Sequence, residues 1–181
     1  MAGEIRSGDF GLLIAYLAPG YVALWCSRPL SPTLAGWVSS DTSEASVGDF
    51  LFATVAAVVA GLMASTVRWA ILDQVHHLTG VRQPQLDFSR LFDRVDAFSR
   101  LVEDQYRYYQ FYGNTLVTLL WGYGVHLYLA WFGAASLDGR EVLLLPAAVL
   151  LFAGSRNTLR TYYCRIEQLL GEEAPSRLIV S

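Results

Sequence analysis

The chain has 181 residues, of which 54% are hydrophobic and only 16% are charged, and its formal net charge is −3. Soluble domains carry about 25% charged residues, so this composition favours a surface that faces lipid. The small net charge excludes a strongly basic nucleic-acid binder and a long acidic tail.

Four apolar runs contain no Asp, Glu or Arg: residues 10–26, 50–67, 115–132 and 142–154. A charge at the centre of a transmembrane helix costs about 2.5–3.5 kcal/mol. We therefore predict an all-α integral membrane protein with four transmembrane helices, at about 10–26, 50–67, 113–133 and 138–155. Residues 1–181 are expected to form a single polytopic domain, with amphipathic helical extensions on the cytoplasmic side.

The first run is expected to be a retained span, because no basic excess precedes it and no small-residue cleavage pattern follows it. Within it, Pro19 has no N–H, so the carbonyl of Ala15 loses its helical donor and the helix is expected to kink. Cys26 lies at the outer end of this run, opposite Cys164 on the inner side, so no disulfide is expected between them.

The arginines give the expected orientation. Eleven of the thirteen precede the first run, lie between the second and third runs, or follow the fourth. Arginines in loops strongly favour the cytoplasmic side. We expect a multi-pass protein of the bacterial inner (plasma) membrane with both its N- and C-termini in the cytoplasm.

The second span carries small residues at spacings of three and four, namely Ala53, Ala57, Gly61 and Ala64. Such a face lets two helix backbones approach closely. Packing within one chain and association between copies explain it equally well.

The cytoplasmic helical region, residues 68–110, follows. A helix is expected to continue to Leu78 and to stop at Gly80, with Asp87 capping the next helix. That next helix has an apolar stripe and is expected to run into the third span; the stripe comprises Leu91, Val95, Phe98, Val102, Tyr106 and Tyr109. Residues 68–110 as a whole contain equal numbers of acidic and basic residues, so direct binding to duplex nucleic acid is not expected.

Two groups of residues in this region are candidate sites. Asp73, His76 and His77 lie just inside the membrane, where helix packing is a better explanation than a metal site or a catalytic centre. Arg82, Arg90 and Arg94 surround a helix start and form a candidate cytoplasmic ligand cluster for a phosphate, although solvated charges explain them about as well. No catalytic residue, cofactor or metal is assigned, and the chain is not expected to be an enzyme.

One face of the third span carries small or polar residues, namely Thr115, Thr118, Gly122, His126 and Ala130. An ionisable residue deep in a membrane helix is by default a functional candidate, so this face is a possible pore-lining stripe. The alternative is close interhelical packing, with a neutral His126 hydrogen-bonded to a neighbouring helix.

A C-terminal helix over 156–170 is expected after the fourth span. Its apolar face comprises Leu159, Tyr162, Tyr163, Ile166 and Leu170, and Gly171 is expected to end it. Helices with one apolar face need a partner. We therefore expect the cytoplasmic helices to pack on one another, within one subunit or between subunits.

These features favour a homo-oligomeric pore or ion channel that is gated from the cytoplasm by a protein or a nucleotide-like ligand. The alternative is a non-conducting membrane anchor or assembly protein that holds a soluble partner through its cytoplasmic helices. In layout alone, a short four-span chain with cytoplasmic helices is similar to small bacterial membrane effectors of antiviral defence, which disrupt the host membrane when a signal arrives. That similarity is an analogy of architecture.

Overall fold

The computed structural model describes residue 11 and residues 13–38, 47–133 and 139–170, apart from the side chains of residues 90, 140 and 141. This part of the chain is all-helical and contains no strand, which confirms the all-α prediction. Its elements, in which η marks 3₁₀ or π geometry, are η1 (Leu13–Leu17), α2 (Ala18–Ser27), η2 (Arg28–Leu30), α3 (Pro32–Val38), α4 (Val47–Val67), η3 (Arg68–Leu72), α5 (Asp73–Leu78), η4 (Phe88–Arg94), α6 (Val95–Leu101), η5 (Val102–Tyr106), α7 (Arg107–Trp131), η6 (Arg140–Leu143) and α8 (Leu144–Leu170).

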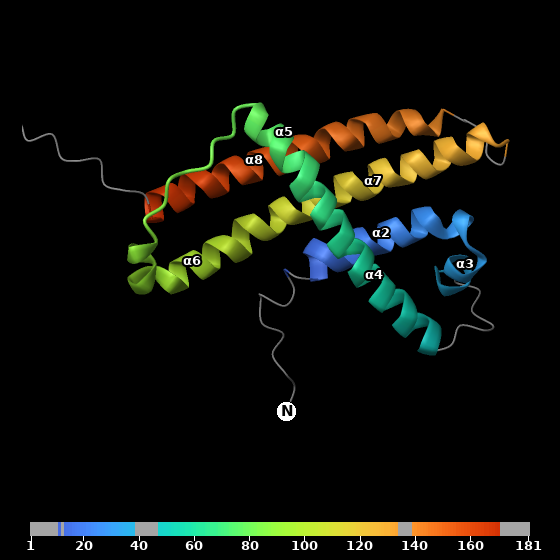
Figure 1. Ribbon diagram of the computed structural model, residues 1–181, viewed down its shortest axis with the longest axis horizontal. Coiled ribbons are helices and arrows are strands. Elements are labelled where there is room, and N and C mark those ends of the chain that lie inside the picture. The colour runs from blue at the N-terminus through green and yellow to red at the C-terminus, as the bar shows by residue number, and fades with distance from the viewer. Residues whose placement is uncertain (1–10, 12, 39–46, 134–138, 171–181) are drawn as a thin grey trace, which may run out of the picture.

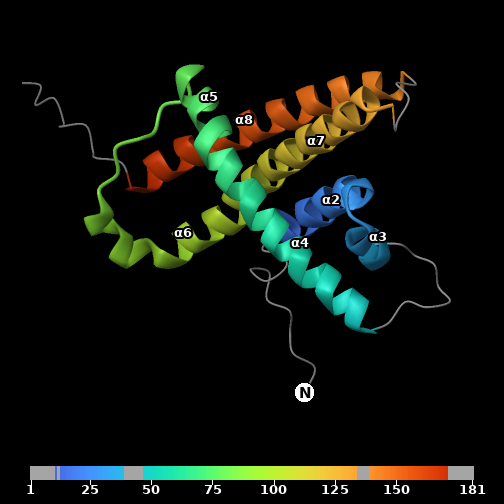
Figure 2. The ribbon, with the colours of Figure 1, turned by 45° about the vertical axis from the view of Figure 1, so that its right-hand side comes forward.

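The helices join into four long segments: η1–α2, α4–η3–α5, α6–η5–α7 and η6–α8. Figures 1 and 2 show that successive segments run in opposite directions. α7 and α8 lie side by side, and α4 crosses α2 and α7 at an angle. The α5–α6 connection and the end of α8 gather at one end of the molecule, which we call the arginine-rich end, and α3 and η6 gather at the other.

Local sequence signals explain where the helices begin and end. The helix that starts at Val47 continues without a break to Leu78, as expected, and Gly80 follows in the left-handed region at φ +99°. Asp87 caps the next helix by accepting a hydrogen bond from the Ser89 amide at 3.0 Å. The first turns after this cap are 3₁₀ rather than α, and the helix then runs through a π-helical turn into α7.

The helices predicted to be cytoplasmic pack on one another within the chain, which is one of the two arrangements expected for them. Val81, Tyr109 and Leu159 form a buried cluster, and three further tyrosines cover it: Tyr106, Tyr162 and Tyr163. Burial of these large rings removes considerable apolar surface from water. The face predicted on the C-terminal helix is therefore the face that α8 turns to α7.

The small-residue face of α4 is occupied inside the chain. Ala53, Ala57 and Ala64 are buried, and the first helical segment lies against them. A Cβ atom on Gly61 would lie 2.1 Å from the carbonyl oxygen of Tyr16, and one on Gly20 would lie 1.7 Å from the carbonyl oxygen of Ala57. The two helices therefore cross with their backbones in contact, an arrangement that only glycine permits at these positions.

Four membrane-spanning helices are not supported by length and hydropathy. Among the described residues only the helix Val47–Leu78 is long and apolar enough to cross a membrane. The first segment, residues 13–27, reaches about 22 Å, which is less than a typical hydrocarbon core of ~30 Å. Tyrosines, Asn114 and His126 lower the hydropathy of α7, and α8 reaches Arg156 soon after it begins at Leu144.

Candidate functional site

Arg68 is the most deeply buried charged residue among those described. It opens the π-helical turn η3 and is only 3% exposed. Its Nε donates a hydrogen bond to Asn114 Oδ1 at 3.1 Å, and its Nη1 forms an ion pair with Asp73 Oδ1 at 3.2 Å. The guanidinium also lies over the ring of Tyr109, 4.6 Å from its centroid. A buried charge needs such partners, because removing it from water is costly.

The start of α7 is shaped to receive Arg68. A Cβ atom on Gly113 would lie 2.4 Å from the Cδ of Arg68, so the Arg68 side chain crosses α7 at a position where α7 has no side chain. The next residue, Asn114, is fully buried and supplies both the acceptor for Arg68 and a donor for Ala15. Adjacent positions on α7 therefore give room and a hydrogen-bond partner to the same guanidinium.

Asn114 also satisfies the first helix. Its Nδ2 donates to the carbonyl oxygen of Ala15 at 2.7 Å. This is the carbonyl that the sequence predicts to be freed by Pro19. A buried carbonyl without a donor costs about 1–3 kcal/mol, so the amide of Asn114 offsets the loss of the proline N–H. One side chain thus ties η1, η3 and α7 together.

Asp73 completes the network. It accepts a hydrogen bond from the hydroxyl of Tyr109 as well as the contact from Arg68. Burial raises the pKa of Tyr109 above its usual range, so the phenol stays protonated and serves as a donor. Asp73 therefore takes part in helix packing through Arg68 and Tyr109.

The two histidines contact α8 instead. His76 is fully buried, and its Nε2 lies 3.1 Å from Ser155 Oγ. His77 Nε2 lies 3.4 Å from the hydroxyl of Tyr163, and the two rings are stacked. Burial, with a smaller contribution from the charge of Asp73, raises the pKa of Tyr163 to about 12. In the described residues no three His, Cys, Asp or Glu side chains group as metal ligands.

A groove opens beside Arg68 on the arginine-rich half of the molecule. It has a volume of about 370 Å³ and is lined by Tyr16, Leu62, Ser65, Thr66, Arg68, Trp69, Tyr106 and Gln110. Each of the three π-helical turns in the described chain contributes at least one of these residues. A π-helical turn interrupts regular helix geometry and is frequently found at functional sites.

Polar contacts extend along the groove to a second arginine. Gln110 Nε2 donates to the hydroxyl oxygen of Tyr16 at 2.8 Å, and Gln110 Oε1 accepts from Arg107 Nη1 at 3.2 Å. The Nε of Arg107 is buried and has no hydrogen-bond partner among the described residues. The groove therefore has guanidinium groups at its wall and close behind it.

The stripe on the third span packs largely against α2. Thr118 is 2% exposed and donates to the Thr115 carbonyl at 3.0 Å. A Cβ atom on Gly122 would lie 2.5 Å from the Sγ of Cys26. His126 and Ala130, nearer the end of α7, are half-buried. In the single chain this face thus serves helix packing, and its use as a pore lining remains a prediction.

The candidate arginine cluster is described only in part, and it stays a prediction. Arg94 Nη1 donates to the carbonyl oxygen of Leu169, so it caps the C-terminal end of α8. Arg82 is exposed, and the side chain of Arg90 lies outside the described part of the structure. Arg156, expected at the inner end of the fourth run, donates to the Thr79 carbonyl at 2.6 Å.

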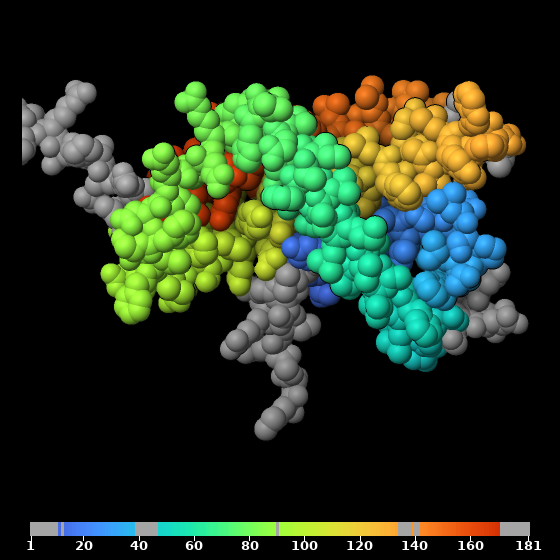
Figure 3. Space-filling model, in the orientation of Figure 1, coloured from blue at the N-terminus to red at the C-terminus, as the bar shows by residue number. Residues whose placement is uncertain are grey.

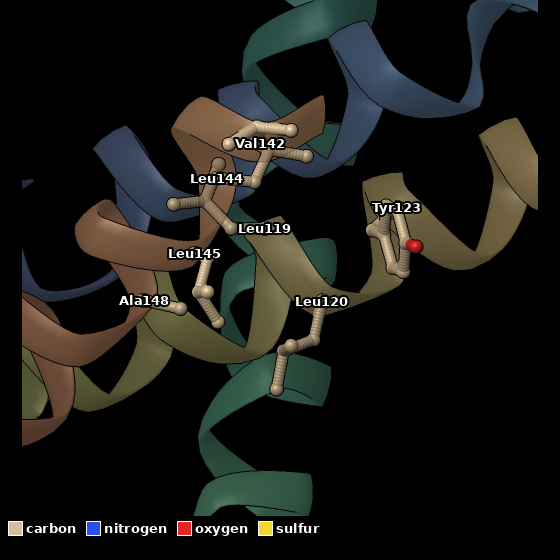
Figure 4. A pocket seen from close by; sticks show the side chains of 7 residues that line it. All are labelled: Leu119, Leu120, Tyr123, Val142, Leu144, Leu145 and Ala148. Atoms are coloured by element: carbon tan, nitrogen blue, oxygen red, sulfur yellow. The ribbon is translucent and has the colours of Figure 1, made fainter. Parts of the chain in front are cut away.

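A second hollow lies at the opposite end of the molecule, between α7 and the start of α8 (Figure 4). It has a volume of about 350 Å³, and its lining is almost entirely apolar: Leu119, Leu120, Tyr123, Val142, Leu144, Leu145 and Ala148. This hollow offers an apolar surface but no group for chemistry.

Sequence reasoning missed the Arg68 network. No pattern in the sequence connected Arg68 with Asn114, Asp73 or Tyr109. The available signal was the sequence Gln110, Gly113, Asn114 directly before an apolar run, because polar residues at a helix entrance at spacings of three and four share one face. We found no match to this chain among protein-family models, curated proteins or solved structures.

Proposed function

We propose that this protein is a polytopic helical membrane protein that acts as a non-conducting anchor and holds a soluble partner at its arginine-rich end. The observation that carries the proposal is the outward surface of three neighbouring helices. Large apolar side chains are exposed on α4, α7 and α8, among them Phe50, Val55, Leu62, Leu120, Trp121, Leu145 and Leu150. A patch of this size on a soluble monomer would be a strong aggregation hazard, whereas in a bilayer it contacts lipid.

The embedding of all four segments is part of this proposal. The helix Val47–Leu78 qualifies alone by hydropathy, and only 22% of its most apolar window is buried, unlike the core helix of a soluble protein. The other segments run in alternating directions, and α4 crosses them at an angle (Figure 1), so successive segments could cross one bilayer in opposite directions. The space-filling view shows α4 lying across the front of the bundle (Figure 3).

The burial of polar groups favours an anchor over a pore. Gly122 faces Cys26 of α2, Thr118 is buried, and Asn114 is bound to Arg68 and Ala15. The exposed face of α4 offers apolar side chains that would make a poor lining for an aqueous channel. A pore lined by the third-span stripe would require α2 to leave α7.

The arginine-rich end provides the surface for a partner. Phe88, Phe92 and Val95 lie on consecutive turns of η4 and α6, and all three are exposed, with Phe92 at 89%. They lie beyond the apolar stretch of α4, at the end for which the arginine distribution predicts a cytoplasmic location. Apolar and aromatic side chains of this kind are typical anchors of a protein interface.

Liposomes test the anchor function. The reconstituted chain is expected to add no ion flux to that of protein-free vesicles, because the polar face of α7 is packed against other helices of the same chain. A photo-crosslinking amino acid at Phe92 is expected to capture one soluble protein in the native cell, and the same probe at exposed Leu145 is the control that should capture lipid. Ion flux that His126→Leu alters would overturn the anchor and support a pore.

The native cysteines test the orientation. Cys164 is exposed on α8 and Cys26 is half-buried at the opposite end, and both are free thiols. In intact spheroplasts a membrane-impermeant maleimide is expected to leave Cys164 of the Cys26→Ser variant unlabelled, and to label it after lysis. Labelling before lysis would place the arginine-rich end outside the cell and contradict the topology.

A further inference from the structure

We propose that the groove around Arg68 binds a phosphate group, carried by the headgroup of an anionic phospholipid or by a soluble phosphate compound. Arg68 lines the groove, is nine-tenths or more buried, and comes from the end of the long helix Val47–Leu78. An arginine guanidinium matches the geometry of phosphate oxygens and is more weakly hydrated than an ammonium group.

Arg68 is held in position at the groove by several contacts. Three N–H groups of its guanidinium are directed to Asn114, Asp73 and Ser65, and Tyr106 is a further hydrogen-bond partner. The contact from Nη2 to Ser65 Oγ is the longest of the three, at 3.5 Å. A phosphate oxygen in the groove would therefore meet a positioned donor rather than one that must be ordered on binding.

Hydroxyl donors surround the same space. Ser65 Oγ accepts from Arg68, and the hydroxyl oxygen of Tyr16 accepts from Gln110, so the O–H of each is left to donate elsewhere. Both side chains line the groove. Behind Gln110, the buried Nε–H of Arg107 has no acceptor among the described residues, and a buried donor of this kind calls for one.

The surroundings fit a phospholipid if the chain is embedded as proposed above. Trp69, 65% exposed, lies at the rim of the groove, and an indole with one polar edge is typical of the headgroup level. Leu62, about two turns before Trp69 in the same helix, also lines the groove and continues into the exposed apolar face of α4. A headgroup at Arg68 would thus place acyl chains along α4.

The three π-helical turns account for the position of the site. η1 supplies Tyr16, η3 supplies Arg68 and Trp69, and η5 supplies Tyr106. Each is a local departure from α geometry of the kind that persists where function or packing demands it. Their convergence on one groove distinguishes it from the apolar hollow between α7 and α8, which no π-helical turn lines.

The test uses the full chain in detergent with three probes: phosphatidylglycerol, phosphatidylcholine and inorganic phosphate. Phosphatidylglycerol is expected to raise the midpoint of thermal unfolding more than phosphatidylcholine, whose cationic choline masks the phosphate. The apparent affinity for the protecting phosphate probe is expected to fall about tenfold in both groove variants. Ser65→Ala loses one charge-assisted hydrogen bond, and Trp69→Leu loses the indole at the rim of the groove. Trp131→Leu, an exposed tryptophan at the far end, is the matched control.

The probes separate the two sources of phosphate. Protection by phosphatidylglycerol alone identifies a lipid headgroup, and equal protection by inorganic phosphate identifies a soluble compound. No protection by any probe, or protection that both groove variants leave unchanged, overturns the proposal. Flotation with liposomes is measured in parallel. A chain that floats but is not protected by any phosphate probe contradicts only the phosphate site, whereas a chain that does not float contradicts the proposed membrane anchor.

Discussion

Gly61→Ala is expected to destabilise the fold by about 3 kcal/mol, although it adds a single methyl group to an apolar helix. The new Cβ atom would lie 2.1 Å from the carbonyl oxygen of Tyr16, and the nearest atoms are all backbone atoms of that residue. No side chain can rotate away, so the first helical segment must move off α4. Moving it also weakens the contact between Asn114 and Ala15, because Ala15 lies in the same turn as Tyr16.

Gly124→Ala is the matched control, since Gly124 lies in α7 and a Cβ atom there would meet nothing within 4 Å beyond its own helix. Alanine is the better helix former, so this variant is expected to gain up to about 1 kcal/mol. The free energy of unfolding is measured for both variants in the same detergent by circular dichroism. Equal effects in the two variants would show that η1 and α4 are not in backbone contact.

Arg68→Met is expected to cost about 3 kcal/mol, because it leaves the carboxylate of Asp73, which is only 16% exposed, without its charged partner. It also removes the donor to Asn114 and the cation above the ring of Tyr109. The free energy of unfolding is again the measurement. Arg160→Met, at an exposed position of α8, is the control and is expected to change stability by about 0.5 kcal/mol or less.

A double variant separates the charge effect from general damage. Asp73→Leu in the Arg68→Met background removes the stranded carboxylate, so it is expected to recover part of the lost stability. Additive losses from the two substitutions would contradict the ion pair. A loss in Arg68→Met no larger than that in Arg160→Met would show that the network does not stabilise the fold.

The boundaries of the helices were predictable because they depend on local signals. Gly80 ends one helix through a conformation that glycine adopts readily, and Asp87 starts the next through its own side chain. The apolar runs correspond to the four long helical segments for the same reason. The number of membrane spans did not follow from the number of apolar runs, because tyrosine, asparagine and histidine residues within α7 lower its hydropathy.

The candidate site was harder to predict because it depends on contacts between distant parts of the chain. Arg68 and Asn114 are 46 residues apart, and Asn114 and Ala15 are 99 apart. Periodicity places residues on a face, but it does not identify the helix that this face meets. The small residues of α4 show the same limit. Their spacing predicted a close helix contact, but it did not tell whether the partner helix belongs to the same chain or to a second copy.

The length of the helix Val47–Leu78 has a mechanical consequence. Its 32 residues reach about 48 Å, well beyond a hydrocarbon core of ~30 Å. On the proposed placement, the apolar part of this continuous helix lies in lipid and its remaining turns lie in the cytosol. In those turns His76 and His77 contact Ser155 and Tyr163 of α8. A thinner bilayer would tilt this helix more strongly, and the tilt would displace the turn at Gly80 at its end.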